Sequence, residues 1–285
     1  MDIVTLDVVI AVKDRASIYR CVSTLLAQIN LVDMLSLGHI LLCDGGSLTA
    51  TCQHQLAQVA KLSKVKILRC CHQGFNKSWL LNQGLAAATA RLVLVSDVDI
   101  LWSAATLKKL SLAAMRQPNC VYSVRSVKES DPSAKAAQRQ RYSYHITRNN
   151  EAARVEIYLA AVSSVERPGC GLLCAQKTLF QKIGGYRDCF QGWGWEDQDF
   201  LIRAQLLGYS VEALGSVVHI THGDSRRNAL HQQRSPQQSR DRNILRCLNG
   251  LAKGQLLGDL PQKNPVARQF PTVSVQYPAN LCDLP

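Results

Sequence analysis

The stretch that most constrains this chain is residues 92–101, which have the sequence LVLVSDVDIL. Four apolar residues, two of them β-branched, run directly into Asp97 and Asp99. A continuous apolar run bounded by polar residues is typical of a strand that is buried on both faces of a parallel sheet. Ligands of open α/β sheets bind at the carboxyl ends of such strands, so the two acids predict a binding site.

The two carboxylates favour a divalent cation, because neighbouring negative charges repel each other unless a cation neutralises them. Asp97 and Asp99 therefore indicate a metal site at the end of a strand. A strand that simply stops at two solvated acids explains an isolated Asp-x-Asp equally well. The rest of the chain must decide between these two interpretations.

Composition restricts the class of protein. The chain has 285 residues, enough for one large domain or two small ones, and its 47% hydrophobic and 19% charged content indicates a globular protein. A net charge of +12 favours an anionic partner such as a nucleotide, a nucleic acid or a membrane surface. The 11 cysteines contain no CxxC pair, which indicates neither a zinc knuckle nor a disulfide framework. Without a signal-peptide pattern or a membrane-spanning apolar stretch, we expect a cytoplasmic protein, with membrane association left open.

Strands alternate with helices in the first half of the chain. We expect strands at residues 8–12, 39–43, 65–68 and 92–95, and helices at residues 17–28, 53–62 and 80–90. This alternation predicts βαβ units and a mostly parallel sheet. In the second half we expect a helix at 104–116, a loop-rich segment at 128–150, strands at 169–174 and 216–222, a mobile segment at 223–242 and an extended tail.

Four sequence blocks in a fixed order carry a resemblance to a known family. They are VKDR at 12–15, FNK at 75–77 with LLNQG at 80–84, SDVD at 96–99, and GWGWED at 192–197. A fifth block, HITH at 219–222, lies where that family places its late metal ligands. The chain resembles GT-A fold glycosyltransferases over roughly residues 6–245. Its N-terminal half is similar to family 2, and its C-terminal half to the β-1,4-galactosyltransferase and chondroitin-polymerase type.

The resemblance implies an α/β, Rossmann-like GT-A fold, with a mostly parallel mixed sheet flanked by helices. It implies a single catalytic domain with a C-terminal extension. Residues 1–105 would form the half that binds the nucleotide sugar, and residues 106–224 the half that binds the acceptor. Residues 225–285 would form a flexible lid and the C-terminal extension. Arg226 or Arg227 of the lid could reach the donor's pyrophosphate.

The activity implied by the resemblance is inverting transfer of a sugar from a UDP-sugar of the Gal, GalNAc or Glc type. The acceptor would be a hydroxyl of a glycan or of a lipid-linked molecule, and no nucleic-acid partner is expected. Such transfer needs a cation on the departing diphosphate, a base for the acceptor hydroxyl and an oriented site. We therefore expect Mn²⁺ or Mg²⁺ as cofactor.

The metal ligands implied by the resemblance are Asp99, His219 and His222. The two histidines are three residues apart, so in a regular strand their side chains would point to opposite faces. Both can reach one cation only if the chain turns at residues 220–221. Two imidazoles and a carboxylate suit Mn²⁺ better than Mg²⁺. The alternative is one ligand and one ordinary surface histidine.

The donor-binding residues implied by the resemblance come from four loops. They are Val12, Lys13, Arg15, Asp44, Phe75, Lys77, Asp97 and Val98. Phe75 would stack on uracil, and the three cations would hold the nucleotide and its phosphates. Asp97 would bind donor hydroxyls, and Asp44 the uracil or ribose. A core aromatic, solvated cations and a turn residue beside two glycines are the structural alternatives for Phe75, the cations and Asp44.

The GWGWED block is the most specific of these signals. Trp193 and Trp195 could form an aromatic wall for a sugar, and the resemblance adds Gly171 to the acceptor site. Asp197 would be the general base, and Glu196 would bind acceptor hydroxyls. Helix N-terminal acids stabilised by the helix dipole are the structural alternative. Gln198 stands where the galactosyltransferase pattern has an acid, which leaves the acceptor open.

Two other classes of protein are alternatives. Phosphohydrolases of the haloacid dehalogenase type also place an Asp-x-Asp after an apolar strand, but a Thr or Val normally follows where this chain has Leu101. A non-catalytic polyanion-binding module would show aromatic residues among its cations, yet the basic stretch 225–246 has none. Neither alternative explains the GWGWED block.

Overall fold

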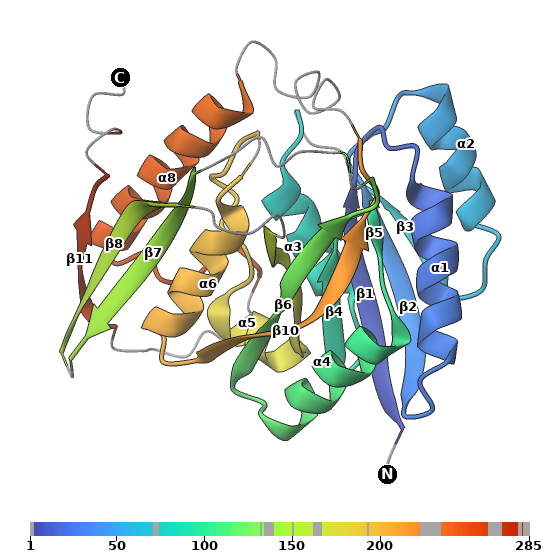
Figure 1. Ribbon diagram of the computed structural model, residues 1–285, viewed down its shortest axis with the longest axis horizontal. Coiled ribbons are helices and arrows are strands. Elements are labelled where there is room, and N and C mark those ends of the chain that lie inside the picture. Colours follow the sequence, from blue (N-terminus) through green and yellow to red (C-terminus); the bar gives the residue numbers. More distant parts are fainter. Residues whose placement is uncertain are drawn as a thin grey trace.

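The computed structural model describes residues 3–70, 74–131, 133, 140–149, 151–161, 167–192, 194–222, 235–261, 270–278 and 281. One sheet is built from β1 (Val4–Val12), β2 (Leu35–Asp44), β3 (Val65–Arg69), β4 (Leu92–Ser96), β5 (Ile100–Leu101), β6 (Cys120–Glu129), β9 (Arg167–Gln176) and β10 (Ser210–His219). Its strand order is β3-β2-β1-β4-β9-β6-β10-β5, and Figure 1 shows β1 between β4 and β2. Strands β9 and β5 run antiparallel to their neighbours, and the other pairs are parallel. The expected mostly parallel mixed sheet is confirmed.

Helices cover both faces of this sheet. On one face lie α1 (Ile18–Asn30), α2 (Ala50–Val59) and α4 (Ala104–Arg116). On the other lie α3 (Lys77–Ala87), α5 (Lys177–Ile183) and α6 (Glu196–Leu206). The central strands are apolar on both sides because Val8 and Ile10 of β1 face the first layer while Val9 faces the second. This double burial is what the continuous apolar runs predicted.

A second, smaller sheet packs beside the first. It consists of β7 (Gln140–Arg148), β8 (Ala152–Ala161) and β11 (Thr272–Gln276), in the order β11-β8-β7. Tyr142 and Val155 of this sheet bury their side chains with Ile202 of α6 and Leu248 of α8 (Pro236–Ala252). Figure 1 shows this unit at the end of the molecule away from α1 and α2. It forms a third hydrophobic core that supports one wall of the site described below.

The second half of the chain differs from three of the sequence expectations. The loop-rich segment 128–150 was a wrong prediction, because β7 pairs with β8 along residues 140–148. The expectation of a mobile segment at 223–242 is wrong for residues 236–242, which open α8 behind a capping box formed by Ser235 and Gln238. Residues 223–234, including Arg226 and Arg227, lie outside the described residues. The extended tail is wrong in part, because residues up to Ala252 belong to α8.

A buried ion cluster fixes the base of α6. Asp199 is fully buried and pairs with Arg203, 2.7 Å away, and with Arg187. Arg203 also donates to the carbonyls of Ile183 and Gly185, so the cluster ties α6 to the end of α5. Charges at this depth are tolerated because each is paired and hydrogen-bonded. Asp199 is therefore a structural acid, unlike its neighbours at the helix start.

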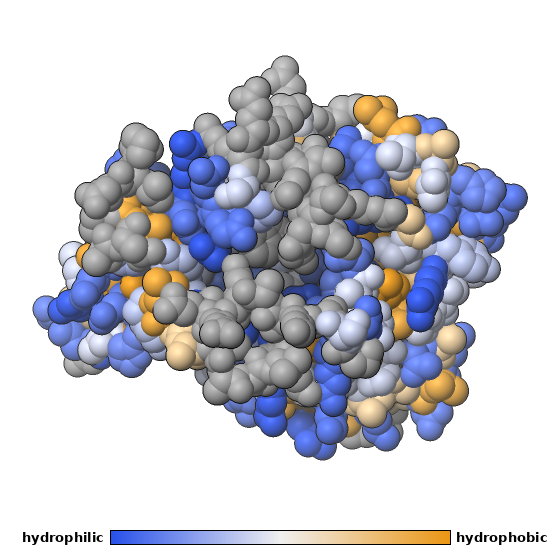
Figure 2. Space-filling view, turned by 45° about the horizontal axis from the view of Figure 1, so that its top comes forward, coloured by the Kyte–Doolittle hydropathy of each residue, from blue (hydrophilic) through white to orange (hydrophobic). Residues whose placement is uncertain are grey.

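All nine cysteines in the described part of the chain are free thiols. None of the described helices combines the length and the apolar character needed to cross a membrane. In Figure 2 hydrophilic residues dominate the coloured surface, and apolar residues form separate small patches.

Candidate functional site

The carboxyl ends of β1 and β4 open into a cavity of about 290 Å³. The starts of α3 and α6, the strand β9, two residues of β7 and single residues of β10 and α8 complete its walls. The predicted site residues among those lining it are Lys13, Arg15, Phe75, Lys77, Asp97, Val98, Asp99, Gly171, Trp195, Glu196, Asp197 and His219. Segments far apart in the sequence thus bring most of the predicted residues together.

Four predicted residues are placed differently. Val12 and Asp44 are fully buried outside the cavity wall, and the Asp44 carboxylate accepts from Ser47 and Arg69. His222 is not part of the wall but contacts Asp99. Trp193 lies outside the described residues.

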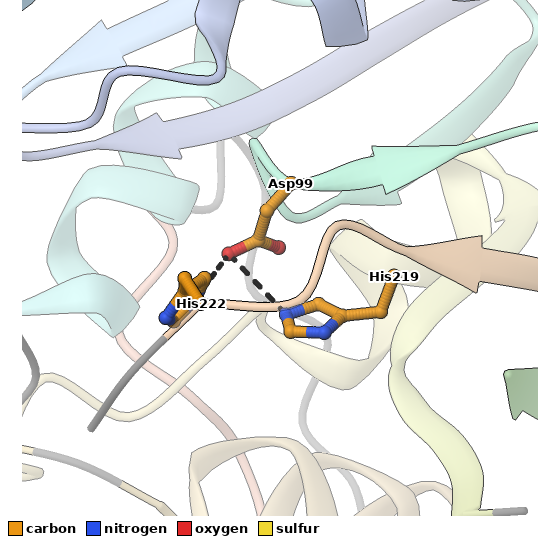
Figure 3. Close-up of side chains that lie close together, drawn as sticks. All are labelled: Asp99, His219 and His222. Atoms are coloured by element: carbon orange, nitrogen blue, oxygen red, sulfur yellow. Dashed lines mark hydrogen bonds and ion pairs between the residues drawn. The ribbon is translucent and has the colours of Figure 1, made fainter. Parts of the chain in front are cut away.

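Asp99, His219 and His222 form a cluster of potential metal ligands (Figure 3). One ligand atom of each lies within 4.8 Å of the others. Nε2 of His222 is 3.1 Å and Nε2 of His219 is 3.6 Å from Oδ2 of Asp99. Asp99 and His219 are 6% and 5% exposed, so the cluster is largely screened from water.

Strand pairing explains why these three side chains meet. Asp97–Asp99 form the turn between β4 and β5, and β5 pairs antiparallel with the end of β10, His219 opposite Ile100. The backbone N–H of Ile220 donates to the carbonyl of Asp99 at 2.7 Å. Since β10 ends at His219, the chain leaves the strand before His222. This is the turn that two histidines facing one carboxylate require.

Electrostatics favour an ionised Asp99. Burial would raise its pKa, but hydrogen bonds from His219 and His222 and the nearby charge of Arg15 outweigh burial and hold the pKa well below its usual range. On the far side of the His219 ring, Nδ1 lies 2.7 Å from Oε2 of Glu129. A carboxylate only accepts, so Nδ1 donates its proton to Glu129, and Nε2 on the other side of the ring faces Asp99. Histidines that bind a metal typically donate their second ring N–H to a carboxylate in this way.

The donor set fits a divalent cation with mixed nitrogen and oxygen ligands. His222 Nε2 also lies 3.3 Å from the Arg15 guanidinium. One ring nitrogen can donate to Asp99 or accept from Arg15, but not both at once. A cation bound to that nitrogen would resolve this conflict, and Mn²⁺ accepts such a ligand set.

The other half of the Asp-x-Asp turn serves a second cluster, centred on Lys77. Its Nζ lies 2.8 Å from Oδ1 of Asp97 and 3.3 Å from Oε1 of Glu196. Burial would lower the pKa of Lys77, but Asp97, Glu196 and Asp197 outweigh it and raise the pKa well above its usual value. Lys77 is therefore charged, and it holds the turn against the start of α6. Asn76 supports it by capping α3 through the Trp79 N–H.

Asp197 projects beside this cluster. Burial and the charge of Glu196 raise its pKa to about 7, although Lys77 pulls in the opposite direction. A Cβ added to Gly171 would lie 3.2 Å from Oδ2 of Asp197, so glycine at 171 leaves room next to the carboxylate. A half-buried carboxylate with this pKa can accept a proton near neutral pH.

The backbone conformation just before α6 places the start of this helix at the cavity. Gly192, Gly194 and Trp195 all have positive φ, +77° for Trp195. Non-glycine residues rarely adopt this conformation, and such strain is frequent at functional sites. Trp195 is 5% exposed, and its ring packs edge-on against Tyr142 with centroids 6.3 Å apart. Only a small part of the indole is therefore available to a ligand.

Several residues of the site were missed at the sequence level. Arg141, Tyr142, Arg167 and Arg240 also line the cavity, and Glu129 supports His219. The alternation of Tyr142, Tyr144 and Ile146 with polar residues was a readable strand signal inside the segment expected to be loop-rich. No sequence signal links Arg240 on α8 to this wall.

Family models match most of the chain. The model described as glycosyl transferase family 2 matches residues 7–165, and the one described as the N-terminal domain of galactosyltransferase matches residues 161–223. Both halves of the predicted resemblance are confirmed in the order in which the motifs occur. A search of curated protein sequences finds no match.

Solved structures share the fold. A crystal structure of GalNAc-T7 with UDP, GalNAc and Mn²⁺ superposes with a TM-score of 0.60 at 15% identity, covering 87% of this chain and 48% of that chain. The mannosyltransferase PcManGT from Pyrobaculum calidifontis, in complex with GDP-Man and Mn²⁺, gives 0.52 at 16% identity, covering 90% and 73%. The chain therefore spans about half the length of the first. The expected GT-A fold is confirmed.

Proposed function

This chain belongs to glycosyl transferase family 2, and from that premise we propose that its cavity transfers a sugar from a UDP-sugar to an acceptor hydroxyl with Mn²⁺ as cofactor. One observation carries the proposal. A single cavity wall holds Asp99 and His219, which form a ligand cluster with the neighbouring His222, and also Asp197, whose carboxyl pKa is raised to about 7. Nucleotide-sugar transfer needs both groups at once.

The Asp99 side of the cavity would hold the donor. Asp99, His219 and His222 would bind Mn²⁺, which offsets negative charge on the departing diphosphate when it is bound. Lys13 and Arg15 line the same side and add positive charge. Phe75 would stack on the uracil, and Asp97 would accept from donor hydroxyls. The two similar structures support this assignment, since one holds UDP with Mn²⁺ and the other GDP-Man with Mn²⁺.

The Asp197 side would hold the acceptor. Asp197 would accept the proton of the attacking hydroxyl, and Glu196, fixed by Lys77, would bind a second acceptor hydroxyl. Trp195 would border the sugar with its exposed edge. One base and direct attack by the acceptor on the donor sugar give inversion of configuration. Retention by double displacement would need a carboxylate nucleophile on the opposite sugar face.

We infer a donor of the Gal, GalNAc or Glc type and an acceptor that is a glycan or a lipid-linked molecule. A cytoplasmic enzyme that touches a membrane peripherally through its positive surface would meet such an acceptor. The net charge of +12 supports contact with a negatively charged membrane surface.

The two alternative classes account for less of the site. A phosphohydrolase would use Asp97 as nucleophile, yet Asp97 pairs with Lys77, and Asp197 would have no role. A polyanion-binding module would need no ligand cluster in its wall. The family match weighs against both.

The experiment is a donor screen with the purified chain. UDP-Gal, UDP-GalNAc, UDP-Glc and GDP-Man are each incubated with Mn²⁺ or with EDTA, and release of nucleoside diphosphate is measured. We expect hydrolysis of one UDP-sugar that requires Mn²⁺. Release from none of the donors, or equal release in EDTA, contradicts the proposal. Preference for GDP-Man would keep the transferase and reject the uracil assignment of Phe75.

A further inference from the structure

The Asp197 side of the cavity carries two arginines that the transfer reaction described above does not use. Arg141 lies in β7 and Arg240 in α8, and both line the cavity. Arg141 is half-buried, and its side chain has no hydrogen bond or ion pair with any residue in the described ranges. Its charge acts on the thiol of Cys170, the neighbour of Gly171, which places it near the Asp197 carboxylate.

Arg240 is held in place by aromatic and polar contacts. Its guanidinium lies 4.7 Å from the centroid of the Tyr142 ring, a cation–π contact, and 2.8 Å from Oδ1 of Asp241. The Tyr142 ring packs on Trp195, the residue immediately before Glu196 and Asp197. A Cβ added to Gly194 would lie 3.4 Å from the Arg240 Cβ. Arg240 thus forms a fixed wall with Tyr142 and Trp195, and its side chain is 18% exposed.

The charges on this side of the cavity are separated from one another. Lys77 already pairs with Asp97 and Glu196, and within the described residues no ion pair joins either arginine to those acids. Among the described residues Arg141 has no ion-pair partner and Arg240 has only Asp241, so a ligand that supplies negative charge would offset the cost of burying these guanidinium groups. The donor's diphosphate does not need these arginines, because Lys13, Arg15 and the ligand cluster lie on the Asp99 side.

We propose that Arg141 and Arg240 bind an oxyanion, a carboxylate or a phosphate, carried by the acceptor next to the sugar whose hydroxyl faces Asp197. This inference rests on the proposed function. Guanidinium groups present several N–H donors in one plane and match both carboxylate and phosphate oxygens. Arg141 belongs to β7 and Arg240 to α8, two elements that contribute to the third hydrophobic core. An oxyanion bound by both would therefore also position the acceptor beside Trp195.

The test compares three acceptors that share one sugar: a neutral glycoside, the corresponding uronate and the corresponding glycosyl phosphate. Transfer is measured as kcat/KM for the wild type, Arg141→Gln and Arg240→Gln. Arg116→Gln, at the exposed end of α4, is the matched control because it removes the same charge far from the cavity wall. We expect at least one anionic acceptor to be preferred by about 10- to 100-fold, since hydrogen bonds to charged groups contribute this much.

Each cavity variant should reduce that preference by about tenfold or more, while Arg116→Gln keeps it. Which anion is preferred separates a carboxylated glycan from a phosphate-linked acceptor. Equal use of neutral and anionic acceptors, or a preference that survives both cavity variants, overturns the inference.

The affinity for the same acceptors, measured by calorimetry with UDP and Mn²⁺ present, tests the inference without turnover. Anion-selective binding that is lost in the variants, without any transfer, would leave the inference standing and reject the proposed function. Binding that does not discriminate among the acceptors overturns the inference whether or not transfer occurs. Thermal melting of each variant confirms that it is folded.

Discussion

Asp99 and Asp197 are carboxylic acids on the wall of one cavity, yet their surroundings shift the pKa of each in opposite directions. Around Asp99, hydrogen bonds from His219 and His222 outweigh burial and lower the pKa. Around Asp197, burial and the charge of Glu196 outweigh Lys77 and raise the pKa to about 7. Neighbouring charges and hydrogen bonds, not the residue type, separate the two roles.

This contrast has a direct chemical meaning. A carboxylate that stays ionised and faces two imidazoles is suited to bind a cation. A carboxyl group that exchanges its proton near neutral pH is suited to take one from a hydroxyl. Asp97 links the two regions, because it belongs to the same turn as Asp99 but pairs with Lys77 in the second cluster.

The largest effect is expected when the contrast is removed at Asp197. Asp197→Asn keeps the size of the side chain and removes the proton acceptor, so kcat should fall by about 10²- to 10⁴-fold. The Mn²⁺ concentration for half-maximal activity should stay the same, because this residue does not touch the ligand cluster. Steady-state kinetics across a Mn²⁺ titration provide both numbers. Turnover like that of the wild type would exclude Asp197 as the base and make Glu196 the next candidate.

A third acid on the same helix sharpens the comparison. Asp199 is buried between Arg187 and Arg203. Asp199→Ala should lower the free energy of unfolding by about 3–5 kcal/mol, because it leaves two buried cations unpaired. Urea denaturation of both variants tests this, with Asp197→Asn expected within about 1 kcal/mol of the wild type. Equal stability of all three proteins would contradict the structural role of Asp199.

These acids also show which features of the structure could be predicted from the sequence. The strands β1 and β4 were predictable because their apolar runs reflect burial on both faces, and the acids at the end of β4 marked the cavity. The strand β7 was missed although Tyr142, Tyr144 and Ile146 alternate with polar residues, because the segment as a whole is basic and polar. The alternation typical of a strand was present, but the polar and basic composition of the whole segment favoured the prediction of a loop.

Other features could not be predicted from local sequence. Whether one or both of His219 and His222 reach Asp99 depends on β5 pairing with the end of β10, which is a long-range contact. Asp44 ends a strand as expected, yet its carboxylate is used by Arg69 and Ser47 inside the fold. Arg240 reaches the cavity because α8 packs on the small sheet. Only the tertiary structure carries that information.

The metal side can be tested independently of the base. His219→Ala and His222→Ala should each raise the Mn²⁺ concentration for half-maximal activity by at least about tenfold. Saturating Mn²⁺ should restore much of kcat, which it cannot do for Asp197→Asn. His145→Ala in β7 is a control, since His145 is exposed and distant from the ligand cluster. If neither substitution changes the Mn²⁺ requirement, the metal is bound elsewhere.

A smaller effect on the same side is expected from Glu129. Glu129→Gln replaces the carboxylate that accepts from His219 Nδ1, so the His219 ring is held less firmly with Nε2 toward Asp99. Mn²⁺ affinity, measured by calorimetry on the unloaded protein, should fall by at most about tenfold. Glu151→Gln, at an exposed position between β7 and β8, removes the same charge and should leave the affinity unchanged. An unchanged affinity in Glu129→Gln would remove Glu129 from the site.

The pH dependence of kcat at saturating Mn²⁺ and donor tests the opposite pKa shifts most directly. Asp197 must be deprotonated to accept a proton, and its pKa is raised to about 7, so activity is lost as the pH falls below 7 and is complete above it. Asp99, whose pKa is lowered, stays ionised throughout this range. We predict a rise of about tenfold per pH unit below 7, followed by a plateau, with this inflection missing from the residual activity of Asp197→Asn. A rate that is flat from pH 5.5 to 8, or an inflection that persists in Asp197→Asn, would contradict the account.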